Sequence, residues 1–108
     1  MAWTITENGK RLEVAIDGRF VAAVAPAARD EISARMHDGM DVLFDLSKMV
    51  HIDSSGIGVL VQVLQKARAH GGRVALVGLQ EGPRLVFEIT KVNRVFDIVD
   101  KPEDAFGS

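Results

Sequence analysis

The amino-acid sequence predicts an α/β fold, a mixed sheet of about 4–5 strands that opens with an antiparallel hairpin, with about 3–4 helices packed mainly on one face. The pair Asn8-Gly9 between two short strand-like segments is a strong hairpin signal. After it, helical and strand patterns alternate, which predicts right-handed crossovers and parallel pairing. The period-two spacing of Leu12, Val14 and Ile16 indicates one solvent-facing side of the sheet, so the helices should gather on the other.

Short-range patterns predict the first two strands and the first helix. Residues 11–17 form the alternating strand, and residues 3–7 are its antiparallel partner across the turn. From residue 26 to residue 37 the pattern becomes helical, because Pro26 suits a first helical position and Gly39 ends the helix. The inward face of this helix repeats at four-residue spacing: Ala28, Ile32 and Met36.

The middle of the chain predicts a central strand followed by a long helix. Residues 41–46 form a short, dense apolar run, as expected for a strand covered on at least one face. A helix over residues 55–70 ends at Gly71-Gly72. Its apolar stripe is wider than a simple surface helix needs. The main face contains Ile57, Leu60, Val61, Leu64 and Ala67, and Val59 and Val63 lie beside it.

The last third of the chain predicts three shorter elements and a C-terminal helix. Residues 73–78 form another strand of the buried type. A short helix begins at Pro83 and ends at Ile89. Residues 95–99 form a last short strand, and a C-terminal helix begins near Asp100. In the short helix the residues expected to face inward are Leu85, Val86 and Ile89.

Length and composition indicate a single domain over residues 1–108. The net charge is −2 and the basic residues are scattered, so nothing suggests a nucleic-acid partner. The N-terminus lacks the basic segment followed by an apolar one that marks a secretory signal. The longest strongly apolar stretch, residues 57–64, is far shorter than the roughly 20 residues of a membrane span. We therefore expect a cytoplasmic protein without membrane insertion.

Enzymatic and metal sites have weak support in the sequence. His51, Asp53 and Ser54 are the residue types of a hydrolytic triad, but they lie too close along the chain to converge as one. A dinucleotide fingerprint would need a third glycine where Val61 stands. No phosphate-binding loop is present, and no two histidines share a metal-type spacing. We expect no catalytic activity and no metal.

The run Asp53-Ser54-Ser55-Gly56 at the start of the long helix has two interpretations. In the structural one, any of the first three side chains caps the helix, because its oxygen accepts a backbone N–H of the first turn. Two details favour a functional role: three capping residues stand where one is enough, and Gly56 and Gly58 would let another chain approach the backbone. A phosphate on an exposed serine there would add about −1.5 to −2 charge at pH 7.

Several runs of the chain resemble the STAS-domain anti-sigma factor antagonists. Residues 42–46 (Val-Leu-Phe-Asp-Leu) and residues 52–60 (Ile-Asp-Ser-Ser-Gly-Ile-Gly-Val-Leu) match the core signature of that family. The resemblance covers nearly the whole chain and continues through three later segments: residues 74–77, 86–89 and 96–98. The family fold is a mixed sheet with helices packed mainly on one side, which agrees with the predicted order of elements.

The resemblance implies a protein that switches partners. Unphosphorylated members of the family bind an anti-sigma factor and so free the sigma factor. The anti-sigma factor is also a serine kinase and phosphorylates the antagonist at the serine after the aspartate, which is Ser54 here. Phosphorylation breaks the complex, and a dedicated PP2C-type phosphatase restores it. ATP belongs to the kinase, so the resemblance implies no cofactor for this chain.

We expect the partner to bind around Ser54, with Asp53 positioning or polarising the site. One departure leaves the identity of the partner open: family members often have an aspartate after the second strand, where Val21 stands here. The alternative function is a STAS-type accessory or scaffold subunit, for example of a lipid-transport ATPase, that never cycles phosphate. The residues expected to bind the partner are Asp53, Ser55, Gly56, Ile57, Val59 and Val63.

Overall fold

A computed structural model describes residues 2–107, which form one five-stranded sheet in the spatial order β1-β2-β3-β4-β5. β1 (Trp3–Asn8) pairs antiparallel with β2 (Arg11–Phe20). β3 (Asp41–Ile52), β4 (Val74–Val77) and β5 (Asp97–Val99) follow in parallel pairing. The predicted hairpin and the predicted parallel crossovers are therefore confirmed. β3 is longer than expected, because it continues beyond residue 46 to the start of the next helix.

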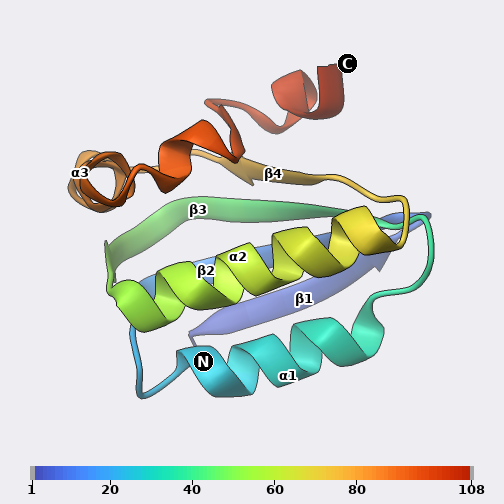
Figure 1. Cartoon of the computed structure of the whole chain (residues 1–108), viewed down its shortest axis with the longest axis horizontal. Helices are drawn as coiled ribbons and strands as arrows, with labels where there is room; N and C mark the ends of the chain where they lie inside the picture. Colours follow the sequence, from blue (N-terminus) through green and yellow to red (C-terminus); the bar gives the residue numbers. More distant parts are fainter. Residues whose placement is uncertain (1, 108) are drawn as a thin grey trace.

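Helices connect the parallel strands. The α-helices of the described residues are α1 (Ala25–Arg35), α2 (Ser54–Ala69) and α3 (Glu81–Thr90). Two short 3₁₀ segments follow, η1 (Val92–Arg94) and η2 (Pro102–Gly107). Figure 1 shows α1 and α2 lying side by side across one face of the sheet, with α3 beside the carboxyl end of β3.

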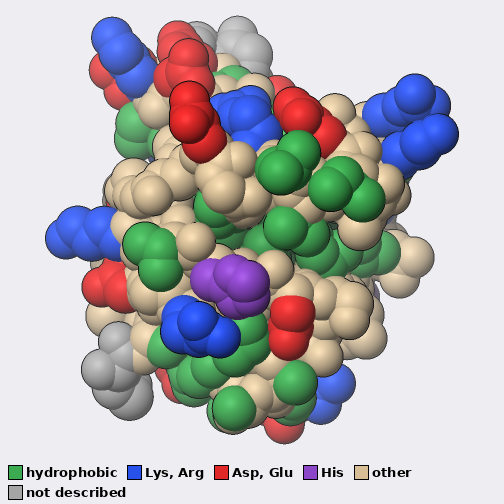
Figure 2. All heavy atoms as spheres, turned by 90° about the vertical axis from the view of Figure 1, so that its left-hand side faces the viewer, with side chains coloured by type: hydrophobic (Ala, Val, Ile, Leu, Met, Phe, Trp, Pro, Cys, Tyr) green, Lys and Arg blue, Asp and Glu red, His purple; other side chains and the backbone are tan. Residues whose placement is uncertain are grey.

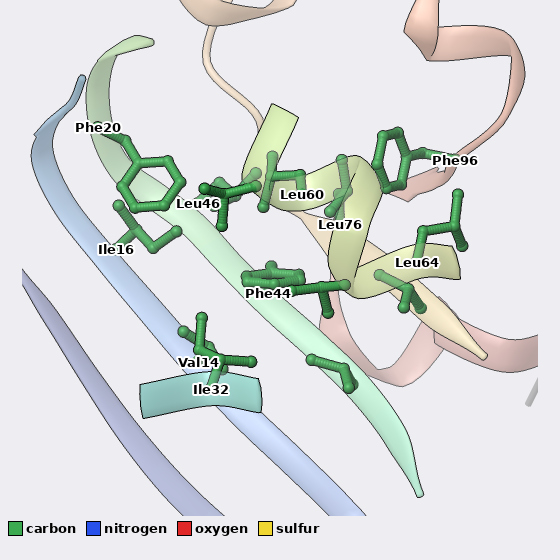
Figure 3. Packing of buried hydrophobic residues seen from close by; sticks show 14 of the residues in the cluster. Val14, Ile16, Phe20, Ile32, Phe44, Leu46, Leu60, Leu64, Leu76 and Phe96 are labelled. Atoms are coloured by element: carbon green, nitrogen blue, oxygen red, sulfur yellow. The ribbon is translucent and has the colours of Figure 1, made fainter. Parts of the chain in front are cut away.

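The main core lies between the sheet and the three α-helices (Figure 3). Phe20, Phe44 and Phe87 are its largest fully buried side chains. α2 contributes a wide apolar surface, because it packs against α1 as well as against the sheet. Val59 and Val63 are only 4% and 2% exposed for that reason, which explains the width of the apolar stripe in the sequence.

A smaller apolar cluster lies on the other face of the sheet. Leu43, Ala75 and Val77 point to that face, and Ala105 of η2 packs against them with no exposed surface. The predicted C-terminal helix is therefore a 3₁₀ segment, kinked at Ala105 and Phe106. It covers part of the face that was expected to be open, because apolar side chains on β3 and β4 need cover from water.

The orientation of α3 corrects one sequence prediction. Leu85 and Ile89, expected to face inward, are 56% and 71% exposed, and Val86 is partly buried. Phe87 faces the core instead, and its ring meets that of Phe96 edge-on at 6.1 Å between centroids. An aromatic ring removes more apolar area from water than an aliphatic side chain, so the helix turns that ring inward.

Candidate functional site

The junction between β3 and α2 places Asp53 at the N-cap of α2 and Ser54 in its first helical position. The backbone of Asp53 is extended, and its carboxylate faces two chain segments. The N–H of Gly56 donates to Oδ1 over 3.0 Å, and the N–H of Ala22 donates to Oδ2 over 3.1 Å. One side chain thus caps α2 and also joins it to the turn that follows β2.

The pKa of the Asp53 carboxyl is lowered, mainly because the N–H of Gly56 donates to it. Burial acts in the opposite direction, whereas the N–H groups of Ala22 and Ser55 and the charge of His51 lower this pKa further. Hydrogen bonds to the charged form favour that form. Asp53 is therefore ionised at neutral pH and stabilises the first turn of α2 as a carboxylate.

Replacing Asp53 by Asn should remove a pH-dependent part of the stability. A folded-state pKa below the unfolded value means that the ionised group stabilises the fold at neutral pH, and that this contribution is lost as the pH falls through the folded-state pKa. Asn still caps a helix, so the variant should fold. Urea unfolding of both proteins should differ most above about pH 5 and converge below about pH 3. A difference independent of pH would contradict this assignment.

Ser54 differs from its neighbours in being exposed and unused by the fold. Because Asp53 already caps α2, no capping bond is required of the serine, and its hydroxyl makes no hydrogen bond within residues 2–107. Ser55 is half-buried in the same turn. The structure thus assigns the capping role to Asp53 and leaves the hydroxyl of Ser54 accessible from outside.

The two glycines of this helix have different surroundings. A Cβ atom at Gly56 would lie 2.3 Å from the carbonyl oxygen of Phe20 and 2.7 Å from Cγ1 of Ile52. Gly56 therefore lets α2 pack against the end of β2 within this chain, and it does not offer its backbone to another chain. A Cβ atom at Gly58 would meet nothing within 4 Å.

The structure places three of the residues expected to bind the partner, Ile57, Val59 and Val63, in the core. Their side chains are 7%, 4% and 2% exposed and belong to the main core. They pack against the sheet and α1 and present little surface to a partner. Their role is to hold α2 in place, and only Asp53, Ser54 and Ser55 of the predicted set remain at the surface.

Exposed apolar side chains beside this junction were not predicted as functional. Val50 on β3 is 58% exposed, and Leu85 and Ile89 lie one turn apart on α3. Gly82 of α3 approaches the carbonyl oxygen of Val50, which brings the two elements together. Figure 2 shows apolar side chains gathered on this face of the molecule. We call Val50, Leu85 and Ile89 the apolar patch. The signal for it in the sequence was the excess of large apolar residues on α3, more than one face can bury.

The turn after β2 contains Ala22 and is hydrogen-bonded through it to Asp53. Val21, at the position where the family resemblance led us to expect an aspartate, is half-buried. Its carbonyl oxygen accepts the N–H groups of Val24 and Ala25 at the entrance of α1. The turn is thus held both by α1 and by Asp53, and it presents no acidic side chain of its own.

Two other kinds of site were sought among residues 2–107. No group of three or more histidine, aspartate or glutamate side chains is arranged to hold a metal ion there. None of the helices in this part of the chain combines the length and the apolar character that crossing a bilayer requires.

The fold and the site define a class: small α/β domains with a mixed five-stranded sheet and an exposed serine at the start of a helix that follows a central strand. Residues 2–105 match the family model of the STAS domain. The chain belongs to the STAS-domain family.

Similar proteins share this domain over most of their length. The anti-sigma-B factor antagonist of Bacillus subtilis is 28% identical over 99 residues, 92% of this chain and 91% of the relative. An anti-sigma factor antagonist from Mycobacterium paratuberculosis has a crystal structure with TM-score 0.82 and 21% identity, covering 95% of this chain and 88% of the other. The phosphorylated form of the Bacillus cell fate determinant SpoIIAA has TM-score 0.74 and 17% identity, with 96% of each chain covered. These two structures support the fold.

Proposed function

We propose that this protein is an anti-sigma factor antagonist controlled by phosphorylation of Ser54. In its unphosphorylated form it binds an anti-sigma factor that is also a serine kinase, and so releases the sigma factor. The observation that carries the proposal is the exposed hydroxyl of Ser54, which the fold does not use because Asp53 caps α2. The names of the relatives, which are anti-sigma factor antagonists, support the same function.

A phosphate on Ser54 would act mainly on the contact with the partner. It would add about −1.5 to −2 charge to the edge of a surface that includes the apolar patch. The N-terminus of α2 favours negative charge, so the phosphorylated protein itself remains folded. Desolvation and repulsion at the interface then lower the affinity, and a loss of about 2–3 kcal/mol changes it by a factor of roughly 30 to 150.

We propose that the partner covers two neighbouring parts of the surface. One is the start of α2, where Ser54 and Ser55 are accessible, and the other is the apolar patch on α3 and the end of β3. An apolar patch next to polar residues is typical of a protein interaction site. Asp53 contributes by holding the first turn of α2 and the turn after β2 together.

Serine substitutions at Leu85 and Ile89 should weaken partner binding without loss of stability. Both side chains are more than half exposed, so the free energy of unfolding should change by no more than about 0.5 kcal/mol. Phe87→Ala on the same helix is the matched control, because it should lower the free energy of unfolding by about 3–5 kcal/mol. Calorimetric titration with the anti-sigma factor measures the affinity. Unchanged affinity of the double variant would exclude the α3 part of the patch from the interface.

The proposed function is tested by mixing the protein with its cognate anti-sigma factor kinase and ATP, and by locating the phosphate with mass spectrometry. We expect one phosphate on Ser54. Ser54→Ala should accept none, whereas Ser55→Ala should be modified as fast as the unmodified protein. Phosphate on another residue, or no phosphate at all, would refute the switch at Ser54.

The remaining parts of the proposal follow from this cycle. A PP2C-type phosphatase removes the phosphate from Ser54 and restores binding. The nucleotide and the catalytic groups belong to the kinase and the phosphatase, so this chain acts as a cytoplasmic binding protein without a cofactor of its own.

A further inference from the structure

A cavity of about 320 Å³ lies near the end of α2 that is remote from Ser54. Its wall combines the last turns of α2, the beginning of β4, the segment before β5 and Phe106 of η2. Arg68 in this wall follows Ser54 by 14 residues, which corresponds to about 21 Å along a helix. The cavity is therefore separate from the proposed phosphorylation site, and its properties do not depend on that proposal.

The floor of the cavity is apolar and its walls are held in place. Leu64 and Val74 are buried core residues, and Val95 is 45% exposed beside them. The guanidinium carbons of Arg11 and Arg73 lie 5.3 Å and 4.8 Å from the centre of the Phe106 ring. These two cation–π contacts help to hold the Phe106 ring in place at the wall of the cavity.

The two arginines that line the cavity have different partners. Arg73 is neutralised, because its NH2 group lies 2.9 Å from Oδ2 of Asp41 and its NH1 group donates to the carbonyl oxygen of Phe106. Asp97 at the rim also acts electrostatically on Arg73. Arg68 donates only to the carbonyl oxygen of Val95, over 3.4 Å, and pairs with no carboxylate within residues 2–107. Most of its N–H groups are therefore available to an anion from outside.

We infer that this cavity binds a small carboxylate with an apolar body of about 6–10 carbon atoms. The carboxylate pairs with the guanidinium of Arg68, and the body lies on Leu64, Val74 and Val95. A cavity of this volume is at the small end of ligand sites, which favours a ligand of modest size. The charge at the rim and the apolar area on the floor both contribute to the affinity. A ligand that lacks either the carboxylate or the apolar body should therefore bind more weakly.

The test is a titration of the full chain with octanoate, acetate and 1-octanol, followed by the backbone amide shifts of the nitrogen-15-labelled protein. Octanoate should move the amides around the cavity and saturate them, with an affinity at least about fivefold above that of either other compound. Equal effects of acetate would mean an adventitious ion only. Equal effects of 1-octanol would mean apolar adsorption only. Either result would overturn the inference.

Variants of the rim and of the floor separate the two contributions. Arg68→Gln should lower the affinity for octanoate at least about fivefold and leave the affinity for 1-octanol unchanged. Val95→Asp places a carboxylate beside the ligand and should abolish octanoate binding. Both positions are exposed, so both variants should fold. Arg84→Gln on α3 removes the same charge elsewhere and serves as the matched control, with unchanged affinity. Octanoate binding that Arg68→Gln leaves intact would refute the assignment.

Discussion

Gly56→Ala should lower the free energy of unfolding by about 3 kcal/mol or more. The added methyl group would lie 2.3 Å from the carbonyl oxygen of Phe20 and 2.9 Å from its ring carbon Cδ2, and 2.7 Å from Ile52. The first obstacle is backbone of β2, which cannot rotate away as a side chain can. Relief requires α2 to move off the sheet at the point where Asp53 caps it. Urea unfolding measures the loss.

Gly58→Ala is the matched control for that substitution. Both glycines lie in the first turns of α2, but a methyl group at Gly58 would meet nothing within 4 Å. Alanine is the better helix former, so this variant should be more stable than the unmodified protein by about 0.5–1 kcal/mol. No loss in Gly56→Ala, or an equal loss in Gly58→Ala, would contradict the assignment of the effect to the contact between Gly56 and Phe20.

Ser54→Asp should weaken binding of the anti-sigma factor by a factor of about 30 or more. The variant places a negative charge on the first helical residue, at the surface that we propose the partner covers. An aspartate near a helix N-terminus is favourable, so the stability of the isolated protein should be unchanged. The loss should therefore appear in the dissociation constant and leave the unfolding midpoint as it is. Ser54→Asn, which has similar size and no charge, is the control and should bind normally.

The same pair of variants separates the switch from a scaffold. An accessory or scaffold subunit that never cycles phosphate would tolerate Ser54→Asp, because Asp53 keeps the helix cap in both proteins. Equal affinity of the aspartate and asparagine variants would therefore support the scaffold and contradict the switch. A loss in both variants would show that the partner contacts the serine itself and senses its size.

Much of the fold could be predicted because its signals lie close together along the chain. Asn8-Gly9 sets the hairpin, and the alternation that begins at Leu12 sets the face of β2 that is buried. The orientation of α3 could not be predicted in this way. Its sequence has apolar residues on more than one side, and only the space beside Phe96 decides that Phe87 is buried while Leu85 is exposed.

The candidate site shows the same division. The sequence alone determined that a strand ends and a helix begins at the run Asp53-Ser54-Ser55-Gly56, since capping and periodicity are local properties. Which of the three side chains caps the helix was decided by the tertiary structure. Asp53 reaches both the first turn of α2 and the N–H of Ala22, 31 residues away in the chain. Each carboxylate oxygen of Asp53 accepts one of these two N–H groups, so neither bond requires the hydroxyl of Ser54.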